Sequence, residues 1–186
     1  MNIFLKFARN LRLNLAEKQR QAWQNQITQK LQQCGKGIHL SKGTAFVCPE
    51  KISLGNNVHI GINGWLQGCG GIVIADNVHI SRNCAIFSAS HNFNGKRLPY
   101  DEEYIVKPVR IEKNVWLGMN VMIVPGVTIG EGAIVGLGTV VVKDVPPLAI
   151  VGGHGHRILK YRDEDHYQSL ENQEAYGGRG GRPLNE

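Results

Sequence analysis

Apolar residues recur at every sixth position through the second half of this chain. The run from Ile111 to Pro146 reads IEKNVW LGMNVM IVPGVT IGEGAI VGLGTV VVKDVP. Each block opens with an aliphatic residue: Ile111, Leu117, Ile123, Ile129, Val135 and Val141. A small or apolar residue follows four positions later: Val115, Val121, Val127, Ala133, Thr139 and Val145. A strict six-residue period excludes a helix and predicts a β-helix of short strands.

Each block is long enough for one short strand and one turn. Three blocks therefore close one triangular coil, and the inward side chains of successive coils stack into a column. Glycines fall in or beside the turns, where a Cβ would clash: Gly118, Gly126, Gly130, Gly132, Gly136 and Gly138. A sandwich of short strands is the alternative, but its turns usually come every eight to twelve residues.

The same period extends toward the N-terminus with two interruptions. Regular blocks cover 54–65 and 74–91, whereas LQGCGGIV, residues 66–73, has two residues too many and predicts a bulged turn. His59 and His79 are twenty residues apart, one coil plus those two residues, so we expect them to stack on one outer face. Two histidines without a third ligand favour a surface ladder over a metal site.

The second interruption is the segment NFNGKRLPYDEEYIVKP, residues 92–108. A long loop leaving a regular repeat is costly to order and is usually functional. Its acidic and basic side chains suit the binding of a polar acceptor such as a sugar. His91 stands directly before this loop.

The chain divides into three segments. Residues 1–34 predict one or two amphipathic helices, residues 35–151 the solenoid, and residues 152–186 a C-terminal extension with a helix within 157–176. Residues 1–34 hold six basic residues against one acid. A cap over the open end of the solenoid is the favoured interpretation, and a basic surface that contacts anionic lipid is the alternative.

Composition narrows the function classes. A hydrophobic content of 42% and a charged content of 19% are typical of a soluble globular protein. The net charge of +6 suggests anionic partners, but no nucleic-acid-binding motif accompanies it, so we expect no nucleic acid. No apolar run has membrane-spanning length and no signal peptide is evident, which predicts a cytoplasmic protein.

The four cysteines carry no recognised pattern. Cys34, Cys48, Cys69 and Cys84 form neither a CxxC pair nor a zinc signature, so we expect reduced structural thiols and no metal. Phosphate-binding, serine-nucleophile and zinc-protease motifs are also absent, and an acyl-enzyme is unsupported. A histidine can instead act directly as a general base, and His91 is the candidate because it is outward-facing beside the long loop.

The run VWLGMNVMIVPGVTIGEGAIVGLGTVVVKDVPP resembles the hexapeptide-repeat acyltransferases. It is most like the maltose and galactoside O-acetyltransferases and the acetyltransferases of bacterial polysaccharide synthesis, over roughly residues 50–160. The resemblance implies an all-β fold, a left-handed parallel β-helix. It also implies acetyl coenzyme A as donor and a homotrimer with active sites between subunits.

The resemblance assigns roles to individual residues. It implies His91 as catalytic base, and Glu103 as an active-site carboxylate, with Glu102 open as the alternative because loop alignments slip. Gln67 aligns with a sugar-contacting asparagine. The positions that match coenzyme contacts are Trp116, Met119, Leu137, Val142, Lys143, Arg157 and Lys160.

Two departures from the family pattern affect different ends of the predicted site, the first the nucleotide end of the coenzyme groove and the second the acceptor side. The segment Gly153-His154-Gly155-His156-Arg157 replaces the common Gly-Asn-Pro-Ala-Lys, and an aspartate near the sugar site has no counterpart. Because Gln67 replaces the sugar-contacting asparagine and that aspartate is missing, the polysaccharide-type enzymes fit better than the maltose and galactoside types. We predict an acetyl-coenzyme-A-dependent sugar O-acetyltransferase of bacterial polysaccharide or glycan biosynthesis, cytoplasmic or peripheral to the inner membrane.

Three other functions remain as alternatives. An amino-sugar N-acetyltransferase is the nearest, and a longer acyl donor stays open. A γ-type carbonic anhydrase shares the β-helix but needs three zinc histidines, and His91 has no close histidine neighbour. A non-catalytic scaffold would leave the loop beside His91 unexplained.

Overall fold

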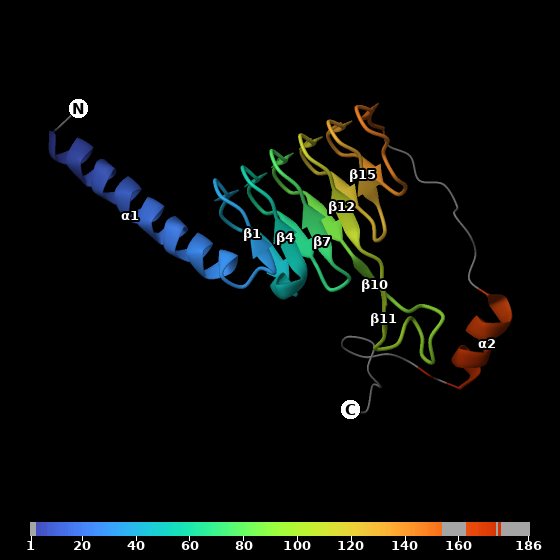
Figure 1. Ribbon diagram of the computed structural model, residues 1–186. Coiled ribbons are helices and arrows are strands. Elements are labelled where there is room, and N and C mark those ends of the chain that lie inside the picture. Colours follow the sequence, from blue (N-terminus) through green and yellow to red (C-terminus); the bar gives the residue numbers. More distant parts are fainter. Residues whose placement is uncertain (1–2, 154–162, 174, 176–186) are drawn as a thin grey trace.

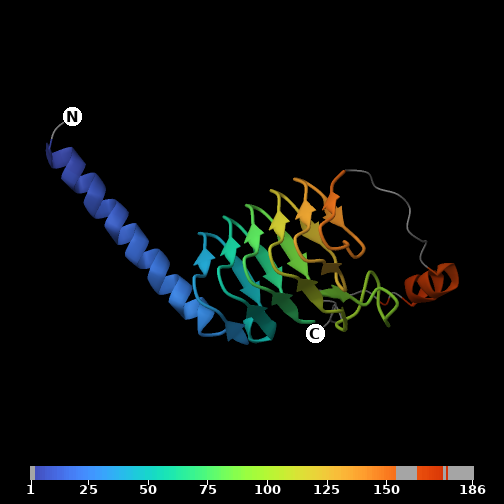
Figure 2. The same cartoon turned by 45° about the horizontal axis from the view of Figure 1, so that its top comes forward.

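The computed structural model describes residues 3–153, 163–173 and 175, and it shows a triangular solenoid between two helices (Figure 1). The long helix α1 (Ile3–Thr28) leads into the first coil, and the short helix α2 (Glu164–Asn172) lies beyond the last one. The coils stack along the solenoid axis in chain order, as the turned view also shows (Figure 2).

Three parallel sheets form the three faces of the solenoid. Face A consists of β1 (Gln33–Cys34), β4 (Ile52–Leu54), β7 (Ile72–Ile74), β12 (Val109–Ile111) and β15 (Thr128–Ile129). Face B consists of β2 (His39–Leu40), β5 (His59–Ile60), β8 (His79–Ile80), β13 (Trp116–Leu117), β16 (Ile134–Val135) and β18 (Ile150–Val151). Face C consists of β3 (Ala45–Val47), β6 (Trp65–Gln67), β9 (Ala85–Phe87), β14 (Met122–Ile123) and β17 (Val140–Val141).

The chain visits the faces in the order A, B, C, so each coil turns at three edges: A–B, B–C and C–A. The residues that open the hexapeptide blocks form the predicted central column, from Ile111 to Val141, and each is at most 5% exposed. The positions four residues later, Val115 to Val145, are buried as well. Burying one such aliphatic side chain contributes about 1.5–3 kcal/mol.

Asparagine as well as glycine makes the corners. Asn57, Asn77 and Asn114 all have positive φ, a region that asparagine tolerates better than most residues. Their side chains also form a ladder from coil to coil, because Nδ2 of Asn57 donates to Oδ1 of Asn77 (3.0 Å) and Nδ2 of Asn77 donates to Oδ1 of Asn114 (3.1 Å). The ladder ties successive corners together on the outside of the column.

The end of α1 covers the first coil. Trp23, Ile27 and Leu31 pack against the core, and the Gln24 amide donates to the Ile38 carbonyl (2.8 Å) and accepts from the Leu40 amide (3.1 Å). This end of the helix is the predicted cap. The preceding turns of α1 project away from the solenoid in both views (Figures 1 and 2).

The prediction of reduced thiols is wrong for two of the four cysteines. Cys48 and Cys69 form a disulfide with their Cα atoms 5.2 Å apart, whereas Cys34 and Cys84 are free. The spacing explains the pair: Val47 and Gln67 are partners in the β3–β6 ladder, so Cys48 and Cys69 follow on adjacent coils at the same edge. The expected bulged turn after β6 brings Cys69 over Cys48.

Candidate active site

A β-hairpin leaves the solenoid at the C–A edge and carries the predicted base. Its strands are β10 (Ala89–His91) and β11 (Tyr104–Val106), which pair antiparallel with His91 opposite Tyr104. The Lys107 amide donates to the Ser88 carbonyl (2.8 Å) and closes the base of the hairpin. The chain then re-enters face A, where Val109 pairs with Ile72.

Two tyrosines hold the imidazole of His91. The Tyr100 ring stacks on it with centroids 3.8 Å apart and an interplanar angle of 18°, and the Tyr104 ring lies 4.6 Å away at 35°. Nδ1 of His91 is buried and has no hydrogen-bond partner among the described residues. Because buried polar atoms are nearly always paired, this nitrogen suits a group supplied from outside the chain.

Asp101 organises the loop between the two strands. Its carboxylate is buried and accepts hydrogen bonds from the Lys96 amide (3.0 Å) and the Glu103 amide (3.1 Å). A Cβ at Gly95 would lie 1.8 Å from Oδ2 of Asp101, so any other residue there would displace this carboxylate. Glu102 forms an ion pair with Arg97 (2.5 Å) and is thus engaged at the loop surface.

Glu103 lines a cavity whose described lining residues do not include His91. Asn92 lines the same cavity, and its amide donates to the Glu103 carbonyl (3.1 Å) directly beyond the His91–Tyr104 pair. Because neighbouring residues of a paired strand point to opposite faces, we infer that Asn92 and Glu103 face away from His91. The predicted catalytic role of Glu103 therefore stays a prediction.

Gln67 supports the hairpin from below. Its Oε1 accepts a hydrogen bond from the Ala89 amide (3.1 Å), and its carbonyl accepts one from the Ser88 hydroxyl (2.8 Å). Ser88 is fully buried and its hydroxyl also accepts from the Gly70 amide (2.9 Å). Sequence reasoning missed Ser88, and the only hint was its place between the bulged turn and His91. The sugar contact predicted for Gln67 stays a prediction.

Three of the predicted coenzyme residues lie on face B and the adjoining B–C edge. Trp116 is 53% exposed on β13 and shares a shallow cavity of about 370 Å³ with Asn77, His79 and Asn114. Met119 and Leu137 are exposed on consecutive coils at the B–C edge, where the Gly138 amide donates to the Met119 carbonyl (2.7 Å). Together they form an apolar strip along the solenoid.

The other predicted coenzyme residues lie elsewhere. Val142 and Lys143 are exposed at the C–A edge, the edge from which the hairpin with His91 emerges. Arg157 and Lys160 lie outside the described residues. Face C separates the two edges, so one chain does not bring all the predicted coenzyme contacts together.

The outer surface of face C is apolar. Trp65, Ala85, Met122 and Val140 lie side by side on four successive coils, and Trp65, Met122 and Val140 are each about half exposed. Half-exposed aromatic and aliphatic side chains in one continuous row favour contact with another protein surface.

The predicted histidine stack is present on face B and is longer than expected. The rings of His59 and His79 lie 4.3 Å apart, and His39 stands 5.6 Å from His59 on the preceding coil. Desolvation lowers the pKa of His59, and the neighbouring imidazoles of His79 and His39 lower it further. Among the described residues, no group of three or more His, Cys, Asp or Glu is arranged to hold a metal ion.

Comparison with known proteins finds that the chain is similar to a transferase repeat family and to several acetyltransferases. Residues 108–143 match the model of the bacterial transferase hexapeptide (six repeats) family. The galactoside O-acetyltransferase of Escherichia coli K12 is 35% identical over 128 residues, 64% of this chain and 63% of that protein. This chain therefore spans somewhat under two thirds of the length of that relative.

Two solved structures extend the likeness. A hexapeptide-repeat acetyltransferase of Vibrio cholerae, in complex with acetyl coenzyme A, has a TM-score of 0.62 and 32% identity over 74% of this chain and 75% of that one. The N-acyltransferase AntD of Bacillus cereus, with dTDP and 3-hydroxybutyryl-coenzyme A, has a TM-score of 0.58 and 27% identity over 81% of this chain and 93% of that one.

The six-residue period, the three parallel faces and these likenesses agree with one another. The fold is the predicted left-handed parallel β-helix, and the chain belongs to the hexapeptide-repeat acyltransferase family.

Proposed function

We propose that this protein is an acetyl-coenzyme-A-dependent O-acetyltransferase that acts on a sugar hydroxyl in bacterial polysaccharide or glycan biosynthesis. The observation that carries the proposal is His91, held between Tyr100 and Tyr104 on a hairpin inserted into the solenoid. The relatives support the reaction class, since one is a galactoside O-acetyltransferase and another was solved with acetyl coenzyme A.

In the proposed reaction His91 is the general base. Bound acetyl coenzyme A supplies a thioester carbonyl as the electrophile. The imidazole takes the proton from the sugar hydroxyl as its oxygen attacks that carbonyl, and then gives the proton to the departing thiolate. The tyrosine rings fix the plane of the imidazole, which spares the cost of orienting it during the reaction.

The exposed side chains fit the proposed donor. Trp116, Met119 and Leu137 offer an apolar strip for the pantetheine arm, and Lys143 offers a cation for a phosphate. Because Lys143 and His91 lie at the C–A edge and the strip at the B–C edge, the groove needs two chains. We propose a homotrimer, in which the C–A edge of one chain meets the B–C edge of the next.

An amino-sugar N-acyltransferase is the second candidate function. The likeness to AntD, an N-acyltransferase that was solved with dTDP and 3-hydroxybutyryl-coenzyme A, favours this function. It also makes an acyl donor longer than acetyl coenzyme A an alternative. A primary amine would lose its proton to His91 in the same way as a hydroxyl.

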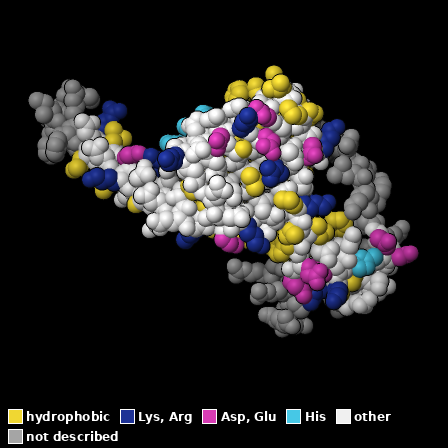
Figure 3. Space-filling view, in the orientation of Figure 1, with side chains coloured by type: hydrophobic (Ala, Val, Ile, Leu, Met, Phe, Trp, Pro, Cys, Tyr) yellow, Lys and Arg dark blue, Asp and Glu magenta, His cyan; other side chains and the backbone are white. Residues whose placement is uncertain are grey.

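We also propose a cytoplasmic enzyme whose α1 rests on an anionic membrane surface. Arg9, Arg12 and Lys18 are exposed on the projecting part of the helix, and its single acid, Glu17, is paired with Arg20. Basic and apolar side chains lie side by side there, as the space-filling view shows (Figure 3). No helix among the described residues is long and apolar enough to cross a bilayer.

The test of the proposed reaction is thiol release from acetyl coenzyme A with nucleotide sugars, free sugars and glycan repeat units as acceptors. We expect turnover with a sugar acceptor, and His91→Ala to lower it by at least about a hundredfold. His39→Ala, which removes an imidazole from face B, is the matched control and should leave turnover unchanged. Equal turnover in the native and His91→Ala proteins would refute the role of His91.

A further inference from the structure

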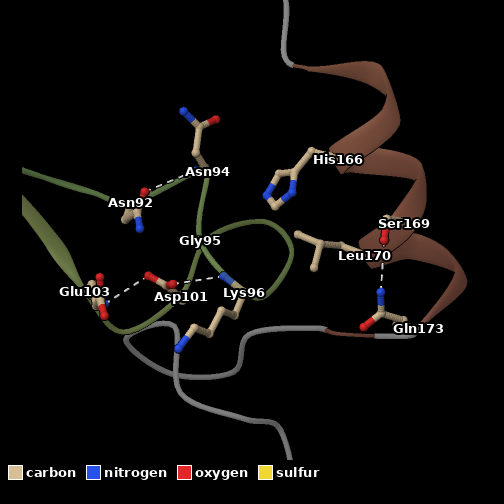
Figure 4. A pocket seen from close by; sticks show the side chains of 10 residues that line it. All are labelled: Asn92, Asn94, Gly95, Lys96, Asp101, Glu103, His166, Ser169, Leu170 and Gln173. Atoms are coloured by element: carbon tan, nitrogen blue, oxygen red, sulfur yellow. Dashed lines mark hydrogen bonds between the residues drawn. The ribbon is translucent and has the colours of Figure 1, made fainter.

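A cavity of about 430 Å³ lies between the hairpin loop and α2 (Figure 4). The helix reaches the loop although some sixty residues separate them in the sequence, and Leu170 of α2 is buried. The Leu98 amide also donates to the Ala175 carbonyl just beyond the helix. The C-terminal extension thus forms one wall of a cavity whose other wall is the loop after His91.

The loop wall offers hydrogen-bonding groups of several kinds. Asn92 and Asn94 contribute side-chain amides, Glu103 a carboxylate and Lys96 an ammonium group. The Asp101 carboxylate also borders the cavity, but it already accepts two backbone hydrogen bonds within the loop.

The helix wall adds an imidazole, a hydroxyl and an amide. His166 points across the cavity toward the loop, and its Nε2 is buried without a hydrogen-bond partner among the described residues (Figure 4). Gln173 and Ser169 hold each other in place, since Nε2 of Gln173 donates to Oγ of Ser169 (3.0 Å). Leu170 adds an apolar patch between them. A buried imidazole nitrogen without a partner points to a missing ligand.

The mixture of groups decides the class of ligand. The cavity offers both donors and acceptors beside one apolar side chain, Leu170, and this mixture suits the hydroxyls and the apolar face of a sugar ring. The carboxylates of Glu103 and Asp101 would repel a phosphate. Among the described residues that line the cavity there is no arginine, and no Phe, Tyr or Trp ring for a base to stack on. A neutral sugar unit fits these walls better than a nucleotide.

The cavity is separate from the reacting centre. Asn92 and Glu103 lie on the face of the hairpin opposite to His91, so a sugar held here does not present its hydroxyl to that imidazole. We propose that the cavity binds a sugar unit of the acceptor glycan other than the unit that is acetylated. The inference rests on the proposed function and narrows the acceptor to an oligosaccharide or a longer chain.

Gln173→Ala tests the proposal against a matched control on the same helix. Gln168 makes a similar bond within α2, to Asn172 (3.1 Å), but does not line the cavity. We expect Gln173→Ala and His166→Ala to raise the KM for oligosaccharide acceptors about tenfold, which corresponds to one lost hydrogen bond. The KM for monosaccharides and the kcat should not change, and Gln168→Ala should resemble the native protein.

Direct binding separates this proposal from the proposed reaction. Malto-, galacto- and chito-oligosaccharides and their monosaccharides are titrated calorimetrically into the native, Gln173→Ala and Gln168→Ala proteins. Oligosaccharide binding that only Gln173→Ala weakens supports the cavity even if no acetyl transfer is found. If no sugar binds, or if all three proteins bind the oligosaccharides equally, the proposed sugar site is refuted. If turnover is found but does not depend on the length of the acceptor, the sugar site is refuted and the proposed reaction still holds.

Discussion

The residues beneath the hairpin determine the position of His91 as much as the residues on the hairpin do. Gln67 and Ser88 together bind the Ala89 amide, the Gly70 amide and each other, so they fix the strand that ends in His91. A shift of that strand moves the imidazole relative to both substrates, and small displacements of a base cost rate. We therefore propose that Gln67 positions His91, the proposed base.

Gln67→Leu separates positioning from sugar contact. The substitution removes the acceptor of the Ala89 amide at similar volume and costs about 1 kcal/mol of folding free energy. We expect kcat to fall about tenfold with an unchanged KM for the sugar, because the strand below His91 loosens. Steady-state kinetics at varied acceptor concentration provide the measurement. A raised KM with normal kcat would instead favour the sugar contact that the sequence predicted.

The sequence predicts His91 but not its surroundings. Its place follows from the hexapeptide count, which runs unbroken from Ile74 up to the loop. The side chain of Ser88 depends on the bulged turn, because it bonds to Gln67 and Gly70. The direction of Glu103 depends on the β10–β11 pairing, and one residue of slippage in that pairing exchanges the two faces of the hairpin. No period governs the loop, so sequence alone does not assign a face to Glu103.

Among the elements, the strands of face B keep a strict register, so identical side chains of successive coils lie next to one another. His39, His59 and His79 are direct partners in the β2, β5 and β8 ladder, so their twenty-residue spacing becomes a column of rings. The sequence predicted two members of this column from spacing alone. The Cys48–Cys69 bridge escaped prediction because both cysteines lie outside the strands, where the period gives no position.

The histidine column predicts a dependence of stability on pH. The pKa of His59 is lowered by desolvation and by His79 and His39, so the unfolded chain binds its proton more readily than the folded one. The contribution of neutral His59 to the free energy of unfolding should be fully present above its unfolded-state pKa of about 6.5. It should be lost as the pH falls through the lower pKa that His59 has in the folded protein. Thermal unfolding between pH 7.5 and 5 is the measurement.

A His59→Gln variant should flatten that dependence. Asp76→Asn is the control for general acid effects, because the backbone amide of Asn56 lowers the pKa of Asp76 and its contribution is lost only in stronger acid, below about 3.9. The same acid sensitivity in the native and His59→Gln proteins would contradict the assignment.

At the scale of the whole molecule, the predicted coenzyme contacts lie on two edges of one prism. Face C between them is apolar at Trp65, Met122 and Val140, which favours burial against a second copy. We expect a solution mass three times the chain mass of 20.6 kDa. Light scattering after gel filtration measures it.

Met122→Asp should dissociate the trimer and abolish turnover together, because a buried unpaired charge is costly in an interface. Gln21→Asp places the same charge on α1 and should alter neither. A native monomer with full activity would show that the groove is complete within one chain.

The projecting part of α1 gives a second prediction for the whole molecule. We expect the protein to sediment with vesicles of phosphatidylglycerol and not of phosphatidylcholine, and to be released by salt, because cations beside apolar residues favour anionic bilayers. Arg9→Glu with Arg12→Glu should abolish sedimentation. The control double variant, Lys36→Glu with Lys42→Glu on the solenoid, should still sediment with the vesicles. Equal loss of sedimentation in both double variants would show that the binding depends on net charge alone.

The hairpin begins and ends at one place in the coil. The Ser88 carbonyl meets the Lys107 amide, and Ile72 pairs with Val109 as if nothing intervened. Because the two ends of the hairpin are already in contact, inserting it adds little to the conformational-entropy cost of closing this coil of the solenoid. The solenoid and the hairpin that carries the proposed base are thus separable modules: a hairpin of another length or chemistry can be grafted between the same two bonds while the core stays unchanged.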